Sequence, residues 1–73
     1  MYTGNYECLE LFVKPEAGKK GSVSLKKIKE NKTEIKELQH IYGNWIKFQT
    51  DKDTEYEITA QDCTITFAYL SEC

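Results

Sequence analysis

The stretch SLKKIKENKTEIKELQHIY, residues 24–42, decides the fold, because its apolar residues are spaced as on one face of a helix. They recur at intervals of three or four residues, with Lys32 where one further apolar residue would fall. The apolar positions are Leu25, Ile28, Ile35, Leu38 and Tyr42. Ser24 suits the N-cap of such a helix and Gly43 the residue after its end. We therefore expect one amphipathic helix over residues 24–42.

Two alternatives remain open for this stretch. Asn31 is a weak helix former and, with Thr33 as a cap, would divide the stretch into two short helices. A hairpin would instead pair residues 23–29 with residues 33–38, turning at Glu30-Asn31-Lys32. The helix is favoured because the apolar residues from Ile35 onward do not alternate as a half-buried strand requires.

The segments on either side of this stretch are predicted to be strands, because they are rich in aromatic and β-branched residues. Their ranges are 6–14, 45–50, 55–60 and 63–70, with a polar turn at residues 51–54. In the first, Leu9, Leu11 and Val13 share one face. The order is β-α-β-β-β, which predicts an α+β fold with one helix on an antiparallel four-stranded sheet. An all-β, SH3-like small barrel is the alternative.

The chain is 73 residues long, which predicts a single domain over residues 1–73. A domain of this size buries only about 60% of its unfolded surface, so it has little room for an enclosed substrate cavity. Its formal net charge of -2 conceals two opposite segments. Residues 19–36 carry a net charge of +5 and residues 51–73 carry −5. Such an asymmetry is typical of a surface that binds a charged partner.

The chain has few residues suited to catalysis or metal binding. His40 is the one histidine, there is no arginine and no CxxC pair, so neither a multi-histidine nor a cysteine metal site is expected. Residues 17–22, AGKKGS, contain glycines and lysines but do not match the GxxxxGK[ST] phosphate-binding loop. The sequence therefore predicts a protein that is not an enzyme and needs no cofactor.

The cysteines and the N-terminal residues bear on location. Cys8 and Cys63 fall in strand-like runs and are expected to be small buried residues, whereas Cys73 is expected to be exposed. Residues 1–7 lack the basic and apolar regions of a signal peptide, and no apolar run approaches the roughly 20 residues of a membrane span. A cytoplasmic protein with no membrane contact is predicted.

The acidic segment is the first candidate for a functional surface. Its residues, on two strands and their turns, are Asp51, Asp53, Glu55, Tyr56, Glu57 and Asp62. Carboxylates spaced along a strand can imitate a phosphate backbone, so the predicted partner is another protein, one that itself binds nucleic acid. A small chain of this kind is typical of phage or mobile-element accessory proteins that inhibit a host or defence protein.

The basic segment supports an alternative, direct binding of nucleic acid. The lysines proposed for it are Lys19, Lys20, Lys26, Lys27 and Lys29. The absence of arginine and a pI near 5.3 count against this alternative. A homodimer through a strand edge or sheet face is compatible with protein binding. In the simplest interpretation the lysines have no binding function and form contacts with the acidic strands in the fold.

Trp45 is expected in the core.

Overall fold

The computed structural model describes all 73 residues and contains no helix, so the predicted helix over residues 24–42 and the α+β class are wrong. The stretch forms the hairpin alternative: β2 (Ser22–Lys27) pairs antiparallel with β3 (Lys32–Glu37). Asn31 has a φ of 54° in the turn, a left-handed conformation that asparagine tolerates and a helix excludes. No helix in the structure could span a membrane.

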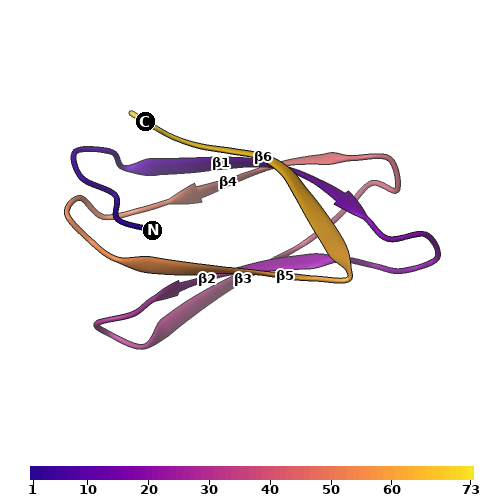
Figure 1. The fold of residues 1–73 in the computed structure, drawn as a ribbon, viewed down its shortest axis with the longest axis horizontal. Coiled ribbons are helices and arrows are strands. Elements are labelled where there is room, and N and C mark those ends of the chain that lie inside the picture. Colours follow the sequence, from indigo (N-terminus) through magenta and orange to yellow (C-terminus); the bar gives the residue numbers. More distant parts are fainter.

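The six strands form two antiparallel sheets of three strands each, one above the other in Figure 1. The upper sheet has the order β4-β1-β6 and the lower sheet the order β3-β2-β5. The remaining strands are β1 (Cys8–Pro15), β4 (Asn44–Gln49), β5 (Tyr56–Gln61) and β6 (Cys63–Ser71). The predicted four-stranded sheet is therefore wrong, whereas the all-β class of the alternative is confirmed.

The connections from β4 to β5 and from β5 to β6 each carry the chain from one sheet to the other, so these three strands are not neighbours in one sheet. β4 pairs with β1, whereas β5 pairs with β2, so the polar turn at residues 51–54 joins the two sheets. β6 starts beside the end of β5 and rises to the upper sheet (Figure 1). Asp53 and Asp62 have positive φ at these two corners, where asparagine and aspartate are the best-tolerated residues after glycine.

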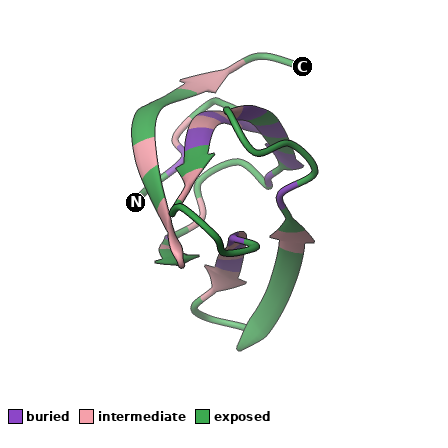
Figure 2. Ribbon diagram, turned by 90° about the vertical axis from the view of Figure 1, so that its right-hand side faces the viewer, coloured by how far each residue is buried: buried purple, intermediate pink, exposed green.

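The core lies between the two sheets and is built from alternate residues of the strands. Leu9, Leu11 and Val13 of β1 are almost fully buried, which confirms the face predicted for this strand. The other buried residues of the core are Val23, Leu25, Leu38, Ile46, Phe48 and Tyr56. Figure 2 shows the burial concentrated in β1 and its neighbours, whereas β3 is exposed along most of its length. Ile28, Ile35 and Tyr42 of the predicted helical stripe are exposed, so that stripe is not a core surface.

A β-bulge in β6 changes which of its side chains face inward. Phe12 pairs with Phe67, but Val13 pairs with Ile65, so Thr66 is an extra residue on β6. Ile65 therefore packs against the core as Val13 does, whereas Phe67 lies on the outer face with Phe12. A shift of one residue reverses the facing of every later side chain in a strand.

A disulfide joins Cys8 to Cys73, with Cα atoms 5.5 Å apart. Cys8 is buried and Cys73 is exposed, as predicted, but the sequence analysis did not foresee the bond between them, which forms because the strand order brings the end of β6 beside the start of β1. Cys63 stays free and half-buried, and its thiol donates to the carbonyl of Ser22 at 3.3 Å. Burial raises the pKa of this thiol.

Candidate binding surface

Four aromatic side chains form a continuous surface, the aromatic face, on the outside of the upper sheet: Phe12, Trp45, Phe67 and Tyr69. Phe12 lies in the central strand, directly opposite Trp45 of β4 and Phe67 of β6. The centroids of the Phe12 and Trp45 rings are 5.0 Å apart, and those of Phe67 and Tyr69 are 5.4 Å apart. These tilted and edge-to-face contacts stabilise the rings in fixed positions.

The aromatic face is open to solvent. Trp45 is 65% exposed, Phe67 54% and Tyr69 40%, so the prediction of a buried Trp45 is wrong. Sheet pairing explains this, because Ile46 and Phe48 of β4 occupy the inward positions and Trp45 must point outward. Three large aromatic side chains therefore lie in one exposed cluster, a kind of surface that is frequent at the interaction sites of proteins.

A row of polar residues borders the aromatic row on the same face. Glu10 lies between Lys47 of β4 and Tyr69 of β6. The Tyr69 hydroxyl donates a hydrogen bond to the Glu10 carboxylate, which raises the pKa of Tyr69. On the other side of the aromatic row, Lys14 is exposed and stands opposite Thr64.

The connection between β3 and β4 is held beside the aromatic face by Asn44, whose side chain is buried. Its Oδ1 accepts hydrogen bonds from the backbone N–H groups of Gln39 and His40, at 2.8 and 2.9 Å. Its Nδ2 donates to the carbonyl of His40 at 2.8 Å. This fixed loop presents Ile41 and Tyr42, which are 75% and 85% exposed.

The acidic residues predicted as a partner surface lie along β5 and at its two ends. Tyr56, one of the residues predicted for this surface, is buried, and its hydroxyl accepts a hydrogen bond from the backbone N–H of Asp51 at 2.9 Å. Asp51 is also ion-paired with Lys27. The hydrogen bonds of Lys27 to Asp51 and to the neighbouring Glu30 raise the pKa of Lys27.

Other predicted carboxylates also have partners within the chain. Asp53 accepts a hydrogen bond from the hydroxyl of Tyr2 at 3.1 Å, which raises the pKa of Tyr2. Asp62 lies 3.6 Å from Lys19, and Glu57 stands opposite Lys26 in the sheet. These carboxylates therefore do not form an unpaired line of negative charge.

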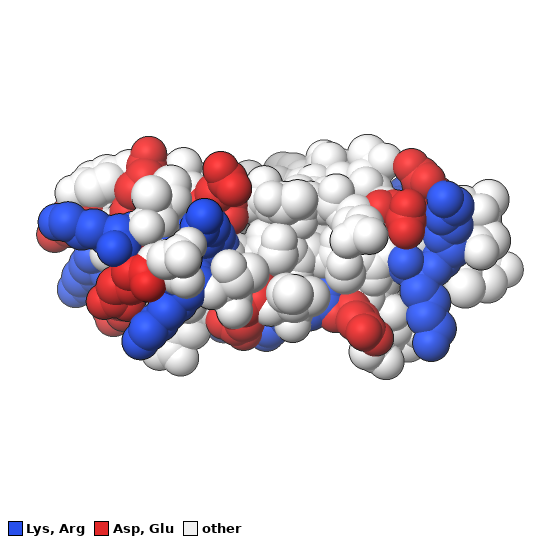
Figure 3. All heavy atoms as spheres, turned by 90° about the horizontal axis from the view of Figure 1, so that it is seen from below, with Lys and Arg blue, Asp and Glu red and all other residues white.

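The predicted nucleic-acid lysines are divided between two ends of the molecule. Lys19 and Lys20 lie in the loop before β2, and Lys26, Lys27 and Lys29 lie at the other end of that strand. Figure 3 shows lysines mixed with acidic residues at both ends of the lower face, with a mainly uncharged band between them. Because the loop at residues 17–22 leads into a strand, no helix N-terminus stands behind it to attract an anion.

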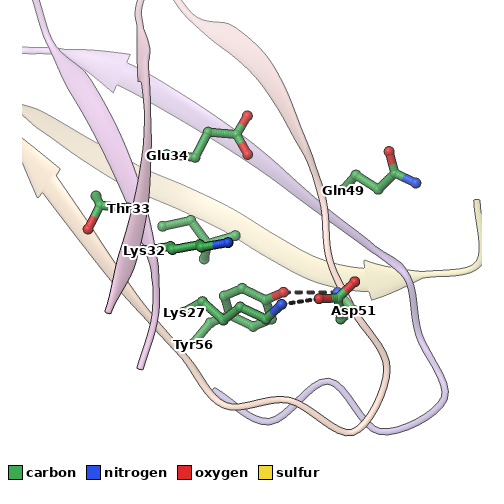
Figure 4. Close-up of a pocket in the computed structure, with 8 residues that line it drawn as sticks. Lys27, Lys32, Thr33, Glu34, Gln49, Asp51 and Tyr56 are labelled. Atoms are coloured by element: carbon green, nitrogen blue, oxygen red, sulfur yellow. Dashed lines mark hydrogen bonds and ion pairs between the residues drawn. The ribbon is translucent and has the colours of Figure 1, made fainter. Parts of the chain in front are cut away.

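A polar hollow of about 240 Å³ lies between the edges of β3 and β4 and contains part of the predicted acidic surface (Figure 4). The side chains of Lys27 and Tyr56 converge on Asp51 there, while Lys32 and Glu34 line its rim. Lys27 and Asp51 are ion-paired with each other in the hollow, whereas the partners of Lys32 and Glu34 are Glu30 and Lys36, which lie outside its lining. No cluster of histidine, cysteine or carboxylate side chains is placed to hold a metal ion.

The sequence prediction did not identify the aromatic face. Its four residues come from three strands, and Phe67 and Tyr69 face outward only because of the bulge at Thr66. The signal available in the sequence was the alternation of Trp45, Lys47 and Gln49 with Ile46 and Phe48, which places Trp45 on the polar side of β4. Comparisons with models of protein families, with curated proteins and with solved structures found no match for this chain.

Proposed function

We propose that this protein is a non-catalytic binding module that recognises another protein through its aromatic face. The observation that carries the proposal is the row of Trp45, Phe12 and Phe67 across one sheet, with Trp45 and Phe67 more than half exposed. Covering one such side chain contributes about 1.5–3 kcal/mol, which a partner would gain on binding. Tryptophan and tyrosine are also enriched among the residues that dominate protein interfaces.

The rigidity of the surface supports the same function. The rings stand on a hydrogen-bonded sheet, and each contacts a neighbouring ring, so little side-chain freedom is left to lose on binding. A surface that is already ordered binds more tightly than a mobile one of equal area. The aromatic face therefore replaces the acidic residues as the main candidate for partner contact.

The arrangement of charge bears on the two partners that the sequence suggested. The acidic residues Asp51, Asp53 and Asp62 are engaged within the chain, which weakens the case for phosphate mimicry. Lysines at two ends, each beside acidic groups, likewise weaken the nucleic-acid alternative. Inhibition of a host or defence protein by a phage-encoded chain stays a prediction. It is compatible with a protein that acts by binding its target and covering part of the target's surface.

The disulfide bears on location. Disulfides persist in oxidising compartments and are rare in the cytosol, so the bond between Cys8 and Cys73 favours an oxidising compartment over the predicted cytoplasm. The cytoplasmic location stays a prediction.

The test is capture of partners by the immobilised protein from an extract of its own source cells. W45S/F67S should lose the partners that the wild type retains, because it removes the most exposed rings. I28S/I35S is the matched control, since it removes two similarly exposed apolar side chains from the other sheet. Equal capture by both variants, each shown to be folded by circular dichroism, would overturn the proposal.

A further inference from the structure

The outer face of β1 carries two opposite charges placed symmetrically about the aromatic row. Glu10 and Lys14 stand two residues before and two residues after Phe12, about 7 Å from it along the strand. All three side chains point away from the core, because Leu9, Leu11 and Val13 take the alternate, buried positions. The order on this face is therefore acid, aromatic ring and base.

The two strands beside β1 place further aromatic residues level with Phe12. In the pairing register Phe12 lies between Trp45 and Phe67, and Glu10 and Lys14 lie on opposite sides of this row of paired residues. A two-fold axis along the row leaves the row in place and exchanges its two sides. Two copies related by this axis would bring ring against ring and acid against base.

We infer that the aromatic face binds a second copy of this chain in this arrangement, as a face-to-face dimer with antiparallel β1 strands. Glu10 of each copy meets Lys14 of the other, twice in the dimer, and the aromatic rows pack between the two ion pairs. The contact is isologous, as in most homodimers, and two sheets can pack face to face about 10 Å apart. The inference rests on the proposed function and names the partner of the same surface.

The charges exclude the other simple arrangement. An axis along the strands would place Glu10 over Glu10 and Lys14 over Lys14, and like charges opposed across an interface repel each other. Lys14 further supports a partner with an acid at this position, because its neighbour on β6 is the uncharged Thr64. Glu10 has Lys47 and Tyr69 as its neighbours within the sheet, and a carboxylate can accept several hydrogen bonds, so it keeps capacity for a donor from the second copy.

Sedimentation velocity from micromolar to millimolar concentration tests the dimer, in a Cys63→Ser background that excludes intermolecular disulfides through the free thiol. The wild type should dimerise reversibly. E10K and K14E should each weaken self-association at least about tenfold, because each places like charges opposite one another. An equimolar mixture of E10K with K14E should associate again, since every pair is then of opposite charge, and E10K/K14E should regain the homodimer.

The control is K32E, which makes the same charge change as K14E on the exposed hairpin of the other sheet and should leave the dimer unchanged. A monomeric wild type, or a mixture of E10K and K14E that associates no better than either variant alone, overturns the dimer. If the wild type is monomeric but W45S/F67S still loses its captured partner, the proposed function stands without the dimer. If W45S/F67S changes neither capture nor self-association, both fail.

Discussion

The ring of Phe12 lies against the backbone of Gly43, where a Cβ atom would come within 2.5 Å of the ring carbon Cζ. Gly43 immediately precedes β4, and Phe12 is the central residue of the aromatic row. The absence of a side chain at Gly43 therefore sets the position of the ring against which Trp45 packs.

Gly43→Ala should lower the free energy of unfolding by about 1–3 kcal/mol, because the new methyl group overlaps the Phe12 ring. It should also change the emission of Trp45, the single tryptophan, whose ring centroid is 5.0 Å from that of Phe12. Urea denaturation followed by tryptophan fluorescence measures both effects. In a Phe12→Ala background the same substitution should cost much less; an equal cost would contradict the contact.

Asn44→Ala should lower the free energy of unfolding by about 2 kcal/mol, because it removes the three hydrogen bonds between the buried Asn44 side chain and the backbone groups of Gln39 and His40. Amide hydrogen exchange should accelerate over residues 39–43, and thermal denaturation gives the change in stability. Asn5→Ala is the control, since Asn5 is exposed. Comparable losses from the two substitutions would show that the Asn44 bonds do not hold this loop.

Cys73→Ser should destabilise the protein by about 4 kcal/mol, because the disulfide closes a loop with a sequence separation of 65. Cys8→Ser should have an effect of the same size, and Cys63→Ser a much smaller one, since Cys63 is free. Denaturation under oxidising conditions compares the three variants. A reducing agent should destabilise the wild type and leave Cys73→Ser unchanged; the opposite pattern would exclude the bond.

The thiol of Cys63 should react slowly with iodoacetamide at mildly alkaline pH, since burial raises its pKa and the thiolate is the reactive form. Mass spectrometry should find one modified cysteine in the native protein, with faster reaction after unfolding. A raised pKa in the folded state favours the protonated thiol. Its contribution to stability is therefore complete below the ordinary pKa of 9.0 and is lost as the pH rises above it. Rapid modification of folded protein would contradict the burial.

The failed helix prediction shows where periodicity misleads. Leu25 and Leu38 are buried, but Ile28, Ile35 and Tyr42 are exposed, so the helical spacing arose from residues with different roles. Lys26 and Lys27, unfavourable in the first turn of a helix, are well placed in β2, where Lys26 faces Glu57 and Lys27 pairs with Asp51. This agrees with the simplest interpretation of the charge, in which lysines meet acidic strands.

The sequence by itself determined where four of the six strands lie and which side of β1 is buried. The ranges 6–14, 45–50, 55–60 and 63–70 agree with β1, β4, β5 and β6 within two residues at each end. These features are local, because they depend on β-propensity, on alternation over a few residues and on the polar residues of the turn at 51–54.

Only the tertiary structure decided how β1 pairs with β4 and β6, and with that the disulfide and the aromatic face. Pairing β1 between β4 and β6 brings Trp45, Phe12 and Phe67 into one row and places Cys73 beside Cys8. The bulge at Thr66 then turns Phe67 outward, although Ile65 two residues earlier faces the core. These outcomes depend on contacts between residues more than thirty positions apart, which no local pattern encodes.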